Sequence, residues 1–283
     1  MYDLVVQEKQ VAIGEAEVSF GSGEKPRYPA LRRSINGYYR DILRPLVELR
    51  ERVFLALPFD DPAKAEGEPF RYLAKHKRLL DESISIFLSE MAGPDRSRDG
   101  FVQGGIESDQ SDGVIQARNI FAHSIGIARA GSVLGIPTTV TGGRQSPSVK
   151  AMLNDAFSRL SENGRLRLEQ VRDEVHSVLT SAQDAGLSPL DTARQLGKRF
   201  DQYAGYEWER LARTESAYAS LAGSREQYQE YGVSHVVWLL SVGACQICQA
   251  FEGKLIPIEE TDSQPPGHVN CLCDISPAGV EVE

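Results

Sequence analysis

The four cysteines of this chain lie in one short C-terminal stretch, and this clustering constrains the fold more than any other feature. Cys245 and Cys248 form a Cys-x-x-Cys pair, and His268, Cys271 and Cys273 follow after a gap. Two residues between cysteines let both sulfurs reach one metal ion from a tight turn. A second group from a separate segment would complete the four-ligand shell that zinc prefers. We therefore predict a structural Zn²⁺ site with these five residues as candidate ligands.

Five candidate donors for a four-coordinate ion leave the composition of the shell open. Cys271 and Cys273, two residues apart in an extended segment, would point to the same face, so both could be ligands. His268 could replace one of them or brace a thiolate from outside the shell. Two disulfide bonds and free thiols are the alternatives to a metal. The N-terminus shows no signal-peptide pattern, so we expect a reducing cytoplasm, which favours metal binding over disulfides.

Composition and charge limit the possible functions. The chain has 283 residues, of which 41% are hydrophobic, enough for one large domain or two small ones. Its apolar runs fall well short of the roughly 20 residues of a membrane span, so we expect no membrane partner. The net charge is −9, and the segment 232–283 carries seven acidic residues against one lysine. A module of this sign is not expected to bind nucleic acid.

Breaks in the hydrophobic pattern divide the chain into five parts. We predict an extended N-terminal arm over 1–33, a helical region over 34–136, a linker over 137–147, a second helical part over 148–231, and a β module with a C-terminal tail over 232–283. The predicted fold class is therefore α+β, mostly helical, with a small C-terminal zinc-stapled β module. A sheet this small has little core of its own, and the ion would compensate.

Helical periodicity is clearest in four segments. Apolar stripes run through 42–57 and 73–91, a helix rich in small residues covers about 114–134, and a long helix covers about 206–231. A helix ending at Gly186 and another starting at Ser188-Pro189 form a hairpin. The part of it at 178–200 has the outline of a helix-turn-helix for DNA, although short helical hairpins occur in many bundles.

A carboxylate on an apolar stripe needs a buried partner. Glu215 lies between Leu211 and Tyr218 on the stripe of the last long helix. We assign Arg213, Glu215 and Trp238 to a structural clamp between this helix and the sheet that follows. Arg213 is too close in sequence to share the face of Glu215, so the direct partner of the carboxylate lies elsewhere. A catalytic acid is disfavoured, because a second carboxylate or nucleophile at a matching spacing is missing.

After Gly232 the pattern becomes that of strands. We predict strands over 235–240, over 253–258 at a sheet edge because of Pro257, and over 268–275. At the other end of the chain, the first helix and its approach are basic. Their side chains form either a solvated face or a docking surface for an acidic partner or DNA, with Arg32, Arg33, Arg40 and Arg44 as the candidate docking residues.

An ordered series of motifs resembles the phage head morphogenesis family, the Mu F-like minor head proteins of tailed bacteriophages. The series comprises Arg213-Thr-Glu215, the helix ending Tyr231-Gly-Val, Val237-Trp, the Cys-x-x-Cys pair, Phe251-Glu-Gly-Lys254, Pro257, Pro265-Pro-x-His268 and Cys271-x-Cys273. The similarity covers roughly 150–277 and is densest over 206–277. Leu272 stands where the family usually has arginine, which changes a side-chain contact and not the candidate ligands.

The resemblance implies a structural, non-enzymatic virion protein. It would act in head morphogenesis at the portal and inner shell, and in DNA packaging or ejection. Its expected partners are the portal protein and, further, the major capsid protein, scaffold or packaged double-stranded DNA, with no small-molecule substrate. It would lie inside the phage head after assembly in the host cytoplasm. Two other functions remain open: a metal-dependent HNH-like nuclease built around His268 and Asn270, and a DNA-binding regulator using the 178–200 hairpin.

Overall fold

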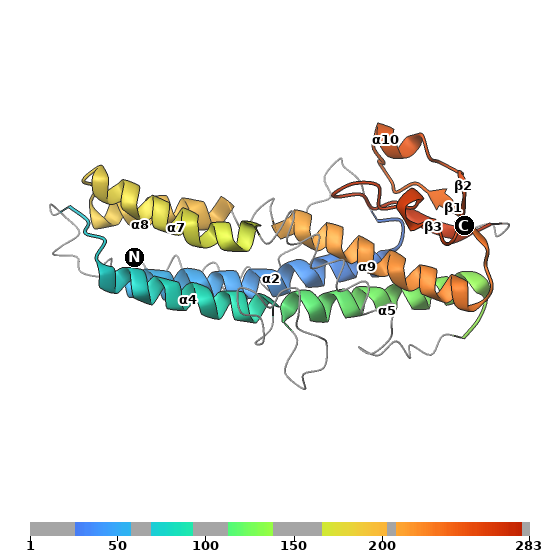
Figure 1. Cartoon of the computed structure of the whole chain (residues 1–283), viewed down its shortest axis with the longest axis horizontal. Helices are drawn as coiled ribbons and strands as arrows, with labels where there is room; N and C mark the ends of the chain where they lie inside the picture. Colours follow the sequence, from blue (N-terminus) through green and yellow to red (C-terminus); the bar gives the residue numbers. More distant parts are fainter. Residues whose placement is uncertain (1–25, 58–68, 93–112, 138–165, 203–207, 279–283) are drawn as a thin grey trace.

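A computed structural model describes residues 26–57, 69–92, 113–137, 166–202 and 208–278 (Figure 1). The helices are α2 (Pro29–Ala56), α4 (Ala74–Ala92), α5 (Val114–Leu134), α7 (Leu166–Asp184), α8 (Pro189–Gln202), α9 (Trp208–Glu230) and the short α10 (Gln246–Gln249). The strands are β1 (His235–Leu239), β2 (Leu255–Pro257) and β3 (Asp274–Pro277). The predicted class is confirmed: the described chain is mostly helical and carries a small sheet near its C-terminal end.

The helices lie along the long axis of the molecule, and α2 spans most of its length (Figure 1). α4, α7 and α8 lie along the C-terminal half of α2, whereas α5 and α9 lie beside its N-terminal half and carry the sheet. One large core joins the six long helices of the described residues, with Ile42, Phe87, Leu196 and Trp208 among its buried members. The helices on the two sides of the predicted linker therefore share a core, although residues 138–147 of the linker lie outside the described residues.

The predicted extended arm is wrong at its C-terminal end, because α2 already begins at Pro29. Proline at the first helical position has its φ preset for a helix and lacks only an N–H that would be unpaired there. Leu31, Ile35, Tyr38 and Ile42 are all buried on one side of α2, and Leu31 carries this stripe upstream of residue 34. The rest of the arm, 1–25, lies outside the described residues.

The predicted helix stripes are mostly confirmed. Leu46, Val53 and Leu57 are buried on α2, and Leu80, Ile84, Phe87 and Met91 are buried on α4. Leu73 is an exception, since it precedes α4 and is exposed. Gly186 and Gly232 adopt positive φ after α7 and α9, as expected for residues that end helices. The Ser188 hydroxyl accepts a hydrogen bond from the Asp191 amide, which caps α8.

α5 and α9 pack closely because glycines face backbone at their contact. A Cβ atom on Gly126 would lie 1.8 Å from the Ser220 carbonyl oxygen, and one on Gly223 would lie 2.1 Å from the His123 carbonyl oxygen. The Ser224 hydroxyl donates a hydrogen bond to the Gly126 carbonyl over 3.1 Å. This contact brings the helix predicted at 114–134 against the helix that precedes the sheet, so it positions the C-terminal module.

The sheet has the order β2-β1-β3, and both pairs are antiparallel. Val236 lies opposite Ile256, and Trp238 lies opposite Ile275. The edge position predicted for the Pro257 strand is confirmed. The third strand does not start at His268 as predicted, but at Asp274. Residues 268–271 form a turn instead: the Cys271 amide donates to the His268 carbonyl, and Asn270 has a φ of 68°.

Candidate metal centre

The five predicted donors lie together in the C-terminal module, where three of the thiols are buried. Cys245 immediately precedes α10, and Cys248 lies within it. His268 lies in the loop before β3, followed by Cys271 and Cys273. Their ligand atoms form two groups, Cys245–Cys248–His268 and Cys248–Cys271–Cys273, within each of which all atoms lie within 4.8 Å of one another. Cys248 belongs to both groups, and the cluster could therefore hold a metal ion.

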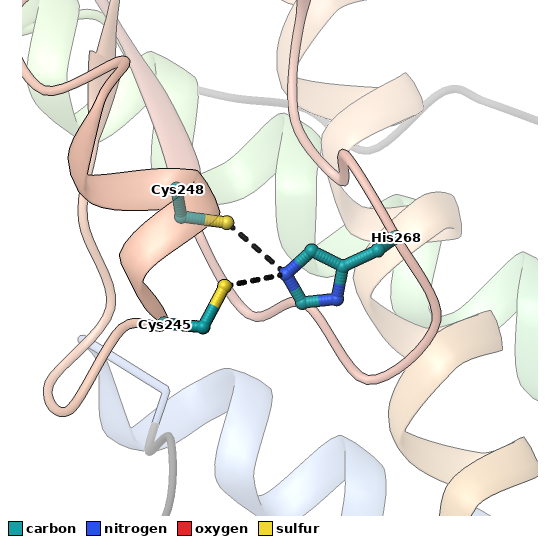
Figure 2. Close-up of side chains that lie close together, drawn as sticks. All are labelled: Cys245, Cys248 and His268. Carbon is teal, nitrogen blue, oxygen red and sulfur yellow. Dashed lines mark hydrogen bonds between the residues drawn. The ribbon is translucent and has the colours of Figure 1, made fainter.

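The distances between donor atoms in the two groups lie within about 0.5 Å of the edges of a zinc tetrahedron. Figure 2 shows the Cys245 and Cys248 thiols pointing at the His268 imidazole, with Sγ to Nε2 distances of 3.1 and 3.2 Å. Zinc bond lengths of about 2.3 Å to sulfur and 2.0 Å to nitrogen give S···N edges of about 3.6 Å and S···S edges of about 3.8 Å. The Cys248 and Cys271 sulfurs lie 3.6 Å apart. All four cysteines are free thiols, so the disulfide alternative finds no support in the structure.

The orientation of His268 suits a ligand that binds through Nε2. Its Nδ1 lies 2.8 Å from the Val269 carbonyl oxygen, to which the Nδ1–H donates. This contact leaves the lone pair on Nε2, the nitrogen that faces the two thiols. Both ring nitrogens of His268 are thus engaged, Nδ1 with the Val269 carbonyl and Nε2 with the two thiols. The position of His268 therefore supports a ligand more than the water-activating histidine of an HNH-like nuclease.

The second group is buried and contains two thiols whose pKa values are shifted in opposite directions. A hydrogen bond from the Cys271 thiol, together with contacts from Ser241, lowers the pKa of Cys273 to about 5. The same hydrogen bond, followed by burial, raises the pKa of Cys271. The Trp238 indole N–H also lowers the pKa of Cys273, although it makes no hydrogen bond of normal geometry to any described residue. One sulfur of this pair is thus ready to bind a cation as a thiolate.

The first cysteine pair shows the same division between an activated and a protonated thiol. The backbone N–H of Cys248 lowers the pKa of Cys245, because N–H groups at the start of α10 favour negative charge. Burial raises the pKa of Cys248 to about 12. Metal ligands must be deprotonated, so a cation that bound here would release the protons of the buried thiols.

Aromatic packing supports the turn that carries the first pair. The rings of Trp238 and Phe251 stack with centroids 4.9 Å apart, and the Lys254 ammonium lies 4.9 Å from the Phe251 centroid. The Phe251 amide donates to the Cys248 carbonyl over 2.9 Å. The position of α10 is therefore fixed by β1 and by the turn that leads into β2.

The loop that carries His268 is held by one face of α9, a feature that the sequence prediction missed. The Thr214 hydroxyl accepts from the Asn270 amide over 3.1 Å. The Tyr218 hydroxyl donates to the Pro266 carbonyl over 3.3 Å, and Arg225 Nε donates to the Gln264 side chain over 3.0 Å. Thr214, Tyr218 and Arg225 recur at four and seven residues, the spacing of a single helix face. This spacing could have indicated a polar face on the helix, but it does not identify the segment that packs against that face.

A buried ion pair makes a second link between the helices and the module. Arg129 on α5 lies 2.8 Å from Asp274, the residue that follows Cys273, and both side chains are almost fully buried. The guanidinium also stacks over the Tyr28 ring at 4.8 Å and donates to the Ile275 carbonyl. Burial raises the pKa of Asp274, and the arginine opposes that shift. In the sequence, the feature that could have indicated this ion pair is Asp274, an acid directly after the candidate ligand Cys273.

The predicted clamp residues contact different parts of the fold. The buried Glu215 carboxylate accepts a hydrogen bond from Asn119 of α5 over 3.3 Å, a contact between two helices. Arg213 lies 3.8 Å from Glu209 on its own helix, and Trp238 packs on Phe251. A clamp that joins Glu215 to the sheet stays a prediction.

The predicted docking residues lie along the N-terminal two-thirds of α2. Arg32, Arg33 and Arg44 are exposed, and Arg40 is half-buried. In the hairpin proposed as a helix-turn-helix, Arg194 pairs with Asp191 of α8, and Arg199 pairs with Glu174 of α7. Those two arginines are thereby neutralised by acids of the hairpin itself, which weakens the case for phosphate binding by α8.

Comparisons with protein-family models, with curated proteins and with solved structures find no match to this chain. Among the helices in the described part of the chain, none is both long enough and apolar enough to cross a bilayer.

Proposed function

We propose that this chain is a structural minor head protein of a tailed bacteriophage, and that its Cys/His cluster binds Zn²⁺. The motif series that resembles the head morphogenesis family supports this proposal. Its members lie on consecutive parts of one unit: Glu215 on α9, Trp238 on β1, the first cysteine pair on α10, and the remaining donors before β3.

The closed arrangement of sulfur-rich donors is the observation that carries the proposal. Four thiols and one imidazole gather from two chain segments, and three of the thiols are buried. Sulfur-rich shells supplied wholly by protein are typical of structural zinc, whereas catalytic zinc keeps one position for water. The three-stranded sheet beside it has a small core, so an ion that ties α10 to the loop before β3 would stabilise the module. We therefore propose a non-enzymatic role.

The proposed site of action is the inside of the phage head, reached during assembly in the host cytoplasm. The portal protein is the proposed main partner, with the major capsid protein, scaffold or packaged double-stranded DNA as further candidates. The long helical body and the compact module at its end would provide separate contact surfaces for such an assembly.

Metal content tests the zinc assignment directly. The full chain, purified under reducing conditions, is expected to contain about one zinc per chain by elemental analysis. Cys248→Ser should lose the metal, because Cys248 is the donor common to both groups. Ile247→Ser is the matched control, since Ile247 is the exposed neighbour of Cys248 and offers no donor. Zinc-free wild-type protein, or equal zinc in both variants, would reject the assignment.

The assembly role needs a separate test. Mass spectrometry of purified phage particles should find this chain in low copy number, and co-expression with the portal protein of the same phage should yield a complex that survives gel filtration. Its absence from particles would reject the head-protein proposal even if the zinc site were confirmed.

A further inference from the structure

Trp238 lies against all three segments that carry the candidate ligands. Its ring stacks on Phe251, in the turn that follows α10, with centroids 4.9 Å apart. A Cβ atom on Gly267, the residue before His268, would lie 3.2 Å from the far edge of the same indole ring. The third segment, which carries Cys273, leads into the strand that pairs with β1. The Trp238 side chain is 3% exposed, so it fills the space between these segments.

The register of β1 and β3 places the Cys273 side chain on the same face of the sheet as the indole. Trp238 lies opposite Ile275, and side chains two residues apart in an extended segment point to the same face. Cys273 is therefore the diagonal neighbour of Trp238, a separation that an aromatic side chain can span. The Cys273 sulfur also lies 3.7 Å from the Ser241 hydroxyl oxygen, so polar groups approach it from the side of β1.

The Trp238 indole N–H has no acceptor at normal hydrogen-bond geometry among the described residues, although it is buried. It lies close enough to the Cys273 sulfur to lower the pKa of that thiol. Sulfur accepts a hydrogen bond weakly as a thiol and more strongly as a charged thiolate. The thiolate form of Cys273 is therefore the best acceptor within reach of this N–H.

We propose that Trp238 is a positioning residue of the metal centre, whose N–H donates a hydrogen bond to Cys273 when this residue is a ligand. The inference rests on the zinc assignment and deepens it. Of the five candidate donors, it assigns Cys273 to the shell, together with Cys248, which belongs to both donor groups. Donors outside the shell fix the direction of a ligand and stabilise its charge. An N–H that already faces the sulfur can do so without rearrangement.

The zinc affinity of the full-length protein, measured by competition with a chelator, tests the inference. Trp238→Phe keeps an aromatic ring beside Phe251 and removes the N–H, so it should weaken zinc binding by about 10–100-fold. Trp208→Phe is the matched control, because the Trp208 N–H is also buried without a hydrogen bond of normal geometry to a described residue. Trp208 packs on Phe87 in the helical core, so its variant should bind zinc as tightly as the wild type.

A double-mutant cycle separates the hydrogen bond from the packing of the ring. If the N–H acts through the Cys273 sulfur, Trp238→Phe should cause no further loss of zinc affinity in a Cys273→Ala background. The same fold-loss in both backgrounds would show that the ring acts by packing alone, and it would overturn the inference.

Cobalt substitution adds a spectroscopic readout that packing does not mimic. An N–H donor lowers the energy of the sulfur lone pair, so the sulfur-to-cobalt charge-transfer band should move to longer wavelength in Trp238→Phe. The band should stay in place in Trp208→Phe. Circular dichroism melting curves establish that each variant is folded. If Trp238→Phe is not, benzothienylalanine in place of Trp238 removes the N–H and keeps the shape of the ring.

The outcomes distinguish this inference from the zinc assignment on which it rests. A wild-type protein that binds no zinc would reject both. A wild-type protein that binds zinc, with equal affinity and an equal cobalt spectrum when the Trp238 N–H is removed, would overturn the role of Trp238 and leave the zinc assignment in place.

Discussion

Adding one methyl group to Gly126 should separate α5 from α9 and destabilise the protein. The new Cβ would lie 1.8 Å from the Ser220 carbonyl oxygen, whereas ordinary contacts begin near 3.4 Å. The obstacle is backbone, so side-chain rotation cannot relieve it, and the helices must move apart by more than about 1 Å. That movement also stretches the 3.1 Å hydrogen bond from Ser224 to the Gly126 carbonyl.

The expected cost follows from these contacts. Overpacking costs about 3 kcal/mol when the obstacle cannot yield, and the weakened buried hydrogen bond costs about 1 kcal/mol more. The higher helix propensity of alanine returns about 1 kcal/mol. Gly126→Ala should therefore lower the free energy of unfolding by about 3 kcal/mol and the melting temperature by about 6–12 °C.

Chemical denaturation followed by circular dichroism measures this change, and Gly197→Ala is the matched control. Gly197 lies on α8, where a Cβ atom would meet only the end of the Arg50 side chain at 3.4 Å. That variant should gain up to about 1 kcal/mol from helix propensity. If Gly126→Ala were as stable as the wild type while Gly197→Ala behaved as expected, the close approach of α5 and α9 would be refuted.

Three further substitutions address buried polar contacts. Burial lowers the pKa of His123, whose Nε2 lies 3.0 Å from Glu226. The unfolded chain therefore takes up the proton first as the pH drops, and stability falls below about pH 6.5. His123→Gln should flatten the pH dependence of the unfolding free energy measured in urea, and an unchanged pH dependence would contradict a buried neutral His123. Asp274→Asn should cost about 3 kcal/mol by leaving the Arg129 charge buried, and Arg129→Met combined with it should recover part of the loss in the same assay. Thr214→Val removes the acceptor of the Asn270 amide and should lower the free energy of unfolding by about 1 kcal/mol. If zinc is the bound ion, this variant should also lose it faster to a chelator. Thr180→Val, at an exposed position on α7, should change neither the unfolding free energy nor the rate of zinc loss.

Local patterns in the sequence were sufficient for α5, for the end of α9 and for the turn of the first cysteine pair. α5 has the predicted limits because small and apolar residues repeat without a break until Gly135, and α9 ends one residue before the predicted end because Gly232 follows closely. The Cys245–Cys248 turn is local in the same sense. Two cysteines at this spacing bring their sulfurs together through the geometry of one helical turn, whatever the rest of the fold does.

Elements with ambiguous local signals, and contacts between distant segments, could not be predicted in this way. The alternation of residues 268–275 suggested a strand, but the donors at 268 and 271 need a turn, which Asn270 supplies in a left-handed conformation. Glu215 was correctly expected to need a buried partner. That partner, Asn119, could not be identified from the sequence because it lies on a helix far away along the chain. The start of α2 was missed because proline suits both an extended segment and the first position of a helix, and Pro29 takes the second role.

The contacts around the cluster indicate that helix docking and metal binding depend on each other. α10 places Cys245 and Cys248 through local turns, but the position of the other three donors is set from outside the sheet. Asn270, between two of those donors, is held by Thr214, and Asp274, after the third, is held by Arg129. A module detached from α5 and α9 would keep the first cysteine pair and lose the alignment of the second group. An ion bound by both groups would in turn resist detachment, because binding to the folded state alone stabilises every contact on which the site depends.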